Sequence, residues 1–317
     1  MKRNKWTTCL VVLTVFAFVT GINPALAGAK EKYEEKFGKT VSLAKDGKVK
    51  LSNISGDVFV KTWNRAEVKI DALKMSTASS LSKAKENAAQ VKIEVRKEGD
   101  MVIIKTKYPK PRIKRLRVSV DYHLMIPEQA SVKASTVSGD VTVEDIAGLL
   151  TASTVSGNVE VSQAAKGAKV NSVSGNLKVF NVEGDVDAET VSGNVTLSAI
   201  KGSISTETVS GNIKMWDVKG AKTIKAGVVS GDVEYRGTVL SDSRYSFKAH
   251  SGDVTLVIPA DSAFDLEAKT FSGGIDCDFQ ITMSGKLKKR EIRGVVNGGG
   301  ADINIKTFSG DIELKKK

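Results

Sequence analysis

The chain has 317 residues, of which 41% are hydrophobic, 26% are charged and 6% are aromatic, with a net charge of +12. This composition excludes a disordered chain. Two cysteines and two histidines argue against a disulfide framework or a metal site built from these residues, so we expect no metal and no cofactor. The 28 glycines and few aromatics predict many tight turns around small core side chains.

Residues 1–27 have the pattern of a secretory signal peptide. A basic start containing Lys2 and Arg3 precedes the apolar run Cys9–Val19, and small residues lead to a cleavage site after Ala27. The run is shorter than the about 18 residues that a membrane-spanning helix needs. We therefore expect an exported protein (periplasmic, at the cell surface or secreted) that is not an integral membrane protein and does not meet intracellular nucleic acid.

A lead segment, residues 28–48, and a β-rich region, residues 49–130, follow the signal peptide. Alternating apolar residues on both sides of Ser55-Gly56-Asp57 predict a hairpin through that turn. Residues 77–90 are expected to form a helix. A long alternating strand over residues 116–126 ends at Pro127.

From residue 131 to residue 317 the sequence repeats. The tripeptide Ser-Gly-Asp/Asn recurs at intervals of 18, 20 and 21 residues. It begins at Ser55, Ser138, Ser156, Ser174, Ser192, Ser210, Ser230, Ser251 and Ser309, with a Ser-Gly-Gly variant at Ser272. A fixed period of about 20 residues is typical of repeat proteins whose units bury their apolar faces against their neighbours.

Within one repeat, apolar and polar residues alternate on both sides of a glycine corner, as at Leu177, Lys178 and Val179. Because this period of two indicates half-buried strands and no helical pattern intervenes, a βαβ arrangement is excluded. We predict an all-β, right-handed parallel β-solenoid with coils of ~18–21 residues, capped by the β-rich N-terminal region. A β-sandwich is the alternative, but it rarely repeats one turn at constant spacing.

The corner glycines are expected to adopt positive φ angles, which side chains disfavour. They are Gly139, Gly157, Gly175, Gly193, Gly211, Gly231, Gly252 and Gly310. The third corner residue is Asn in the strictly periodic coils and Asp outside them. Since stacked amides hydrogen-bond whereas stacked carboxylates repel, we interpret the asparagines as structural. Asp232 and Asp253 are exceptions unless their spacing separates them. The calcium-binding β-roll pattern is absent.

Several segments together resemble the bacterial "putative adhesin" domain family. They are Thr62-Trp63-Asn64-Arg65, the strand ending Met125-Ile126-Pro127, the serial Val-Ser-Gly-Asp/Asn units and the closing stretch from Gly298 to Ile312. The resemblance covers roughly residues 40–315. It implies an exported β-repeat protein of a family whose members are mostly of unknown function.

Catalytic motifs are missing from the sequence: it has no P-loop, no Gly-x-Ser-x-Gly elbow and no His-Glu-x-x-His. His123 is expected on a solvated strand face, His250 at a packed corner and Cys277 on the apolar face of a strand. Asp276 and Asp278 project from one strand face and are the best candidates for paired catalytic carboxylates. The simpler interpretation, which we favour, is strand alternation with a polar outer face.

Two basic clusters could bind anionic polymers by long-range attraction, although solvated loops would have the same composition. Their residues are Lys105, Lys107, Lys110, Arg112, Lys114, Arg115 and Arg117 in the first cluster, and Lys286, Lys288, Lys289 and Arg290 in the second. Phe180 and Trp216 occupy the same repeat position two coils apart, with Ser198 between them. They could form an outward aromatic platform, or fold over the solenoid edge.

The sequence therefore predicts a non-enzymatic, adhesin-like protein of the cell envelope. Its expected partners are envelope or extracellular polymers or surface proteins. Two alternatives stay open. One is a polysaccharide lyase or hydrolase on a β-helix, using Asp276 and Asp278 or an unidentified lysine. The other is a regulatory protein that senses envelope stress.

Overall fold

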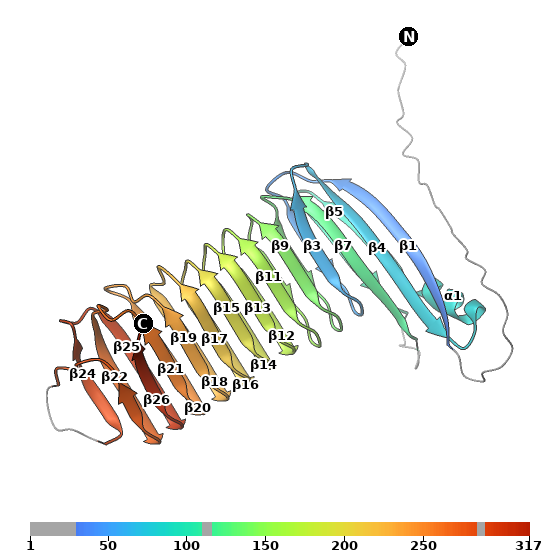
Figure 1. The fold of residues 1–317 in the computed structure, drawn as a ribbon. Helices are drawn as coiled ribbons and strands as arrows, with labels where there is room; N and C mark the ends of the chain where they lie inside the picture. The colour runs from blue at the N-terminus through green and yellow to red at the C-terminus, as the bar shows by residue number, and fades with distance from the viewer. Residues whose placement is uncertain (1–29, 110–115, 284–288) are drawn as a thin grey trace, which may run out of the picture.

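The computed structural model describes residues 30–109, 116–283 and 289–317. Over that part of the chain the protein is an elongated parallel β-solenoid with two long sheets and one helix (Figure 1). This confirms the predicted all-β solenoid. The signal-peptide residues 1–27 lie outside the described residues.

Each sheet has 13 strands within the described ranges. In spatial order the first sheet contains β1 (Glu31–Ser42), β4 (Glu67–Ala78), β7 (Val118–Pro127), β3 (Val58–Trp63), β9 (Val141–Ile146), β11 (Val159–Ala164), β13 (Leu177–Val182), β15 (Val195–Ile200), β17 (Ile213–Val218), β19 (Val233–Gly237), β21 (Val254–Ile258), β26 (Ile312–Lys316) and β23 (Ile275–Cys277). The second sheet contains β24 (Glu291–Val296), β22 (Phe264–Ser272), β25 (Ala301–Ser309), β20 (Arg244–Ser251), β18 (Thr223–Ser230), β16 (Ile204–Ser210), β14 (Val186–Ser192), β12 (Ala168–Ser174), β10 (Leu150–Ser153), β8 (Ser131–Ser135), β2 (Lys48–Ser52), β6 (Met101–Lys107) and β5 (Lys92–Glu98).

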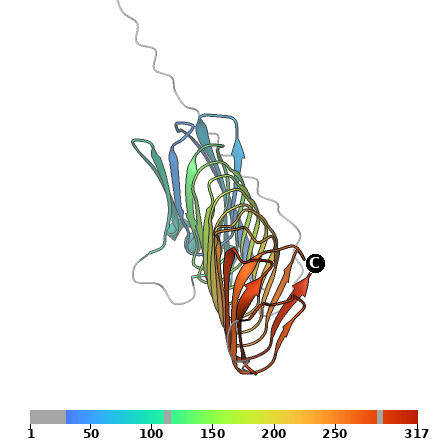
Figure 2. The same ribbon diagram turned by 90° about the vertical axis from the view of Figure 1, so that its left-hand side faces the viewer.

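In the central coils the chain alternates between the two sheets, one strand in each. Every strand pairs in parallel with its equivalent 18 residues away, so that Val159, Leu177 and Val195 are in register. Figure 2 shows these coils stacked one behind another along the solenoid axis. Alternate residues point inward, and those of the central coils, such as Val179, Ala188 and Leu197, are fully buried. Small side chains are required because the two sheets enclose a narrow interior.

The glycine corners are imposed by contact between coils. Gly193 has a φ of +158°, and a Cβ built on it would lie 2.1 Å from the carbonyl oxygen of Gly175 in the preceding coil. Real Cβ atoms do not approach backbone oxygen so closely. Any side chain at this position would therefore push the coils apart, in addition to the strain of a positive φ angle.

The predicted hairpin through Ser55-Gly56-Asp57 is wrong. β2 lies in the second sheet and β3 in the first, and Ser55 forms a parallel bridge to Ser138. The two strands are therefore already a solenoid coil, which begins well before residue 131. Sequence alternation could not distinguish the two arrangements because both put a glycine turn between two alternating strands.

Between this first coil and the next, residues 64–109 and 116–127 build the widened N-terminal end (Figure 1). β4 runs antiparallel to β7, which pairs in parallel with β3. β1 runs antiparallel to β4 along the outer edge of the first sheet. The helix α1 (Leu81–Gln90) is shorter than predicted because Thr77 and Ala78 belong to β4. Ser80 caps the helix by accepting a hydrogen bond from the Lys83 amide.

At the C-terminal end the chain order and the spatial order differ. β25 lies between β20 and β22, so that Ser309 is in register with both Ser251 and Ser272. The last coil in the sequence, β25 and β26, thus lies between the coil of β20 and β21 and the coil of β22 and β23. No helix in the described chain is long and apolar enough to cross a membrane.

Candidate functional site

The third corner residue of each coil forms a continuous ladder along the solenoid. Its side-chain oxygen accepts a hydrogen bond from the backbone amide of the equivalent residue one coil further on. The distance is 2.8 Å from Asn194 Oδ1 to the Asn212 nitrogen and 2.9 Å from Asp232 Oδ1 to the Asp253 nitrogen. Because the donor is a backbone amide, the side-chain oxygen of either Asn or Asp can accept this hydrogen bond. The expectation of amide-to-amide stacking is therefore wrong, and Asp232 and Asp253 do stack in adjacent coils.

At its N-terminal end the ladder begins with Asp121, whose Oδ1 accepts a hydrogen bond from the Asp57 amide at 3.0 Å. Burial raises the pKa of the Asp121 carboxyl, and the neighbouring Asp57 carboxylate adds to that rise. Within the described residues, no group of three or more His, Cys, Asp or Glu side chains is arranged so that it could hold a metal ion.

The residue just before each corner serine is apolar and exposed in most coils. We call this row the corner ridge. In spatial order it contains Ile54, Val137, Val155, Val173, Val191, Val209, Val229, His250, Phe308 and Phe271. The valines are 43–48% exposed, and Phe271 is 63% exposed. His250 stacks on Phe308 at 4.9 Å between ring centroids, and Phe308 on Phe271 at 4.7 Å.

His250 is therefore exposed and is part of the ridge, where a packed corner residue was expected. The exposed corner ridge was not predicted from the sequence, although the sequence carries a signal for it. Val or Phe recurs before Ser-Gly at a position that strand alternation assigns to the outer surface.

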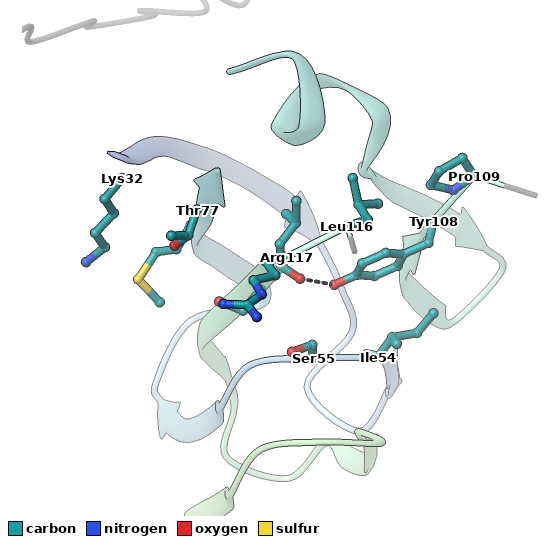
Figure 3. Close-up of a pocket in the computed structure, with 11 residues that line it drawn as sticks. Lys32, Ile54, Ser55, Thr77, Tyr108, Pro109, Leu116 and Arg117 are labelled. Atoms are coloured by element: carbon teal, nitrogen blue, oxygen red, sulfur yellow. Dashed lines mark hydrogen bonds between the residues drawn. The ribbon is translucent and has the colours of Figure 1, made fainter. Parts of the chain in front are cut away.

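The corner ridge ends at a pocket of about 560 Å³, which we call the N-terminal pocket (Figure 3). Ile54 and Ser55 of the first coil form part of its wall. It is completed by Lys32 from β1, by Met75 and Thr77 from β4, and by Tyr108, Pro109, Leu116, Arg117, Val118 and Ser119. Two cationic side chains thus border a mostly apolar surface.

The wall of the N-terminal pocket is held by hydrogen bonds from its polar atoms. The Tyr108 hydroxyl donates to the Val118 carbonyl at 2.8 Å, the contact drawn in Figure 3. In that view Arg117 lies between Lys32 and Tyr108. Lys32 Nζ lies 2.7 Å from Glu34 Oε1, and both side chains are about half exposed.

A buried polar cluster behind the pocket fixes the first corner. Asn53 Nδ2 donates to the Val120 carbonyl at 2.8 Å, and Thr106 Oγ1 lies 2.9 Å from Asn53 Oδ1 and 2.7 Å from the Tyr122 hydroxyl. Burial raises the pKa of Tyr122 to about 12. The phenol therefore stays protonated and can hold Thr106 in place.

Only part of each predicted basic cluster lies within the described residues. Lys110, Arg112, Lys114, Arg115, Lys286 and Lys288 lie outside the described residues. Lys107 pairs with Glu94 at 2.7 Å and lowers the pKa of that carboxyl, while Lys105 and Lys289 are exposed. Arg290 donates to the Phe271 carbonyl at 2.8 Å, at the opposite end of the solenoid from Arg117. Arg117 alone of the described members lines the N-terminal pocket.

Asp276 and Asp278 lie on the exposed surface of the terminal coil. Asp276 is in register with Glu313, and Asp278 Oδ2 accepts a hydrogen bond from the Lys316 amide at 3.2 Å. Neither lines the N-terminal pocket or the two shallower hollows of the second sheet.

The other residues singled out in the sequence are dispersed. Phe180 and Trp216 occupy one outward row with Ser198 between them, but Phe180 is half-buried and Trp216 is 40% exposed. His123 lies on the exposed face of β7 beside Phe59. Cys277 is half-buried against the core, and this burial raises the pKa of its thiol.

Comparison with known proteins identifies the family. Residues 47–315 match the family model described as Toastrack DUF4097, and no curated protein matches the chain. Three solved structures are among the matches. A "putative cell adhesion protein" from Clostridium sporogenes is 12% identical, with 90% of this chain and 100% of that chain covered and a TM-score of 0.26. A "putative adhesin" from Bacteroides fragilis is 11% identical (88% and 97% covered, TM-score 0.35). A "putative lipid binding protein" from Parabacteroides distasonis is 12% identical (89% and 96% covered, TM-score 0.34).

The family match covers most of the sequence and confirms the resemblance to adhesin-like repeat proteins. The chain belongs to the Toastrack DUF4097 family.

Proposed function

We propose that this Toastrack family member is an exported, non-enzymatic binding scaffold of the cell envelope, whose ligand is an anionic amphiphile held in the N-terminal pocket. The observation that carries the proposal is the pairing of Lys32 and Arg117 with an apolar lining in one pocket. Export follows from the signal-peptide pattern of residues 1–27. The solenoid would hold this site on a rigid, extended body.

The chemistry of the lining defines the ligand class. Ile54, Met75 and Leu116 offer apolar surface to an acyl chain, and each buried methylene group contributes about 0.8 kcal/mol. Arg117 presents a planar fork of donors that suits phosphate or carboxylate oxygens, and Lys32 adds a second positive charge. The volume of about 560 Å³ is within the usual range for small-ligand sites.

Electrostatics favour an anionic headgroup, such as a phosphate, over a neutral one. The basic excess of the whole chain, +12 before any cleavage, attracts anionic envelope components over a distance set by salt. Envelope polymers that carry a lipid anchor have this combination of charge and acyl chain. The proposal therefore narrows the expected polymer partners to those with an anionic amphiphilic end.

The test is calorimetric titration with lysophosphatidylglycerol, which is anionic, and with lysophosphatidylcholine, which is zwitterionic, both below their micelle concentrations. We expect the anionic lipid to bind roughly tenfold or more tightly. The variant Lys32→Gln/Arg117→Gln should lose that preference, whereas Lys36→Gln, an exposed lysine on the same strand but outside the pocket, should keep it. Equal affinity of the protein for the two lipids, or no binding of either, would overturn the proposal.

A further inference from the structure

We infer that the outer face of the second sheet, from β12 to β22, together with the adjoining corner ridge, is the interface of a homodimer. The two copies would pack face to face around a two-fold axis that runs parallel to the strands through β18. This inference is independent of the ligand proposed for the N-terminal pocket.

The first argument is the exposed apolar surface. Six successive valines of the corner ridge, each 43–48% exposed, are followed by His250 and by two phenylalanines of 48% and 63% exposure. Hydrogen-bonded strands lie about 4.8 Å apart, so these side chains form one continuous stripe. A monomer rarely leaves a contiguous apolar stripe of this extent in water, and such stripes mark association surfaces.

The second argument is the order of charges beside the stripe. Two residues before the ridge residue, each strand carries an outward side chain, and neighbouring strands keep these side chains in register. From β14 to β25 the row is Glu189, Glu207, Gly227, Lys248 and Lys306. Two acids therefore mirror two bases on either side of a central glycine.

A two-fold axis parallel to the strands leaves the position of a residue along its strand unchanged, so this row of charges faces the same row of the second copy. The rotation reverses the order in which the strands follow one another across the sheet. With the axis through β18, Glu207 faces Lys248 of the second copy, and Glu189 faces Lys306. Each of these pairs occurs twice because the interface is isologous. All four side chains are exposed. Within the described ranges none of them forms a salt bridge in its own chain, although Glu189 lies near Lys169 and helps to raise the pKa of that lysine.

The third argument is shape. A shallow hollow of about 590 Å³ extends over β12 to β20, and its lining includes Val191, Val209, Gly227 and Val229. Gly227 leaves the centre open, since even a Cβ there would have its nearest neighbour 3.6 Å away. The same symmetry brings the aromatic end of the second copy's ridge onto this half, with Phe308 facing Val191. The aromatic end of one ridge thus meets the valine half of the other. A second hollow, of about 580 Å³, lies over β20, β25 and β22 and is lined by Lys248 and Lys306 among others.

An anionic membrane is a poorer occupant of this face, because Glu189 and Glu207 would repel it. A second copy of the chain is favoured over a different protein, because the row of charges becomes complementary to itself when the order of its strands is reversed. The arrangement has one like-charge contact, since Lys225, two residues before Gly227 on β18, faces its own copy near the axis. This contact gives a distinct test.

The experiment is sedimentation equilibrium of the protein and of two charge-reversal variants. Glu189→Lys/Glu207→Lys and Lys248→Glu/Lys306→Glu should each weaken self-association by roughly tenfold or more. Mixed in equal amounts, the two variants should form a heterodimer, because one then presents only bases and the other only acids. Lys178→Glu/Lys214→Glu, which reverses exposed lysines of the first sheet, should dimerise like the unchanged protein.

Removing the like-charge contact should act in the opposite direction, so that Lys225→Gln tightens the dimer. Circular dichroism would show that each variant is folded. A protein that is monomeric at all concentrations, or charge-reversal variants that dimerise as well as the unchanged protein, would overturn the inference. A mixture that fails to form the heterodimer would also contradict it.

Discussion

The central coils and the N-terminal end of this molecule are stabilised in different ways. In the coils, one short sequence is repeated, and each side chain contacts its own equivalent in the next coil, as at the corner ladder of Asn158, Asn176 and Asn194. At the N-terminal end, the contacts join side chains of different kinds from different segments, as in the cluster of Asn53, Thr106 and Tyr122. The repeat builds a rigid body, whereas the irregular end builds a pocket.

The largest effect is expected at a corner glycine of the coils. Gly193→Val should lower the free energy of unfolding by about 4 kcal/mol or more, because its Cβ would clash with the Gly175 carbonyl oxygen at a positive φ angle. Urea denaturation measures this change. Gly38→Val on the edge strand β1, where a Cβ has 3.8 Å of clearance, is the control. Equal losses for the two variants would contradict the stacked-corner account.

The next effect concerns the N-terminal end and depends on pH. The pKa of Tyr122 is raised to about 12 in the folded protein, against about 10 in an unfolded chain. Below pH 10 the protonated Tyr122 therefore makes its full contribution, about 3 kcal/mol, to the free energy of unfolding. This contribution is lost as the pH rises toward 12. Burial also raises the pKa of Tyr235 in the coils.

Tyr122→Phe should remove only the N-terminal part of this alkaline destabilisation. At neutral pH it should cost about 1 kcal/mol, through the lost hydrogen bond with Thr106. Between pH 10 and 12 its stability should fall less steeply than that of the unchanged protein, as followed by urea denaturation at each pH. Parallel pH profiles would show that Tyr122 is not a buried phenol in the folded state.

The corner ladder gives a smaller effect. Asn194→Ala removes the acceptor for the Asn212 amide and should cost about 1 kcal/mol of unfolding free energy. Asn194→Asp keeps an acceptor oxygen in the same place and should cost less. If Asp proved as damaging as Ala in thermal melting, the bond from side chain to backbone would not be what selects these residues.

The smallest effect is a gain in stability at the opposite edge of the coils. Ala199 has a φ of +54°, in the row that holds Asn181 and Asp217 at similar angles. Because a left-handed conformation costs an alanine about 1 kcal/mol, Ala199→Gly should raise the unfolding free energy by up to about 1 kcal/mol. Ala188→Gly, in a buried strand position, should lower it. Melting temperatures that fall for both variants would argue against strain at Ala199.

The coils were predictable because equivalent residues of successive repeats pair with one another, so the repeat spacing indicates which strands are neighbours. The recurrence of Ser-Gly-Asx and the alternation in Leu177–Val182 indicate both strands and corner. The spatial order was not predictable, since Ser272 follows Ser251 at the usual spacing, yet Ser309 lies between them in the structure. Equivalent corners are interchangeable in sequence, and only packing at the end of the solenoid decides which one is outermost.

The candidate site was harder to predict than the fold. Arg117 was among the basic residues singled out, but Lys32 lies in β1, a strand so rich in charged residues that its sequence lacks the apolar alternation of a buried strand. The two residues are 85 positions apart in the sequence and meet only through the antiparallel pairing of β1, β4 and β7. The N-terminal pocket is a product of that pairing and of the first corner, neither of which a local pattern specifies.

Hydrogen exchange with and without lysophosphatidylglycerol tests the central claim, a rigid solenoid with its ligand site at the N-terminal pocket, most directly. We expect the lipid to protect backbone amides at the N-terminal pocket, in β1, at the first corner and around Arg117, and to leave the coils over residues 131–283 unchanged. Protection spread along the coils, or centred on Asp276 and Asp278, would contradict the account.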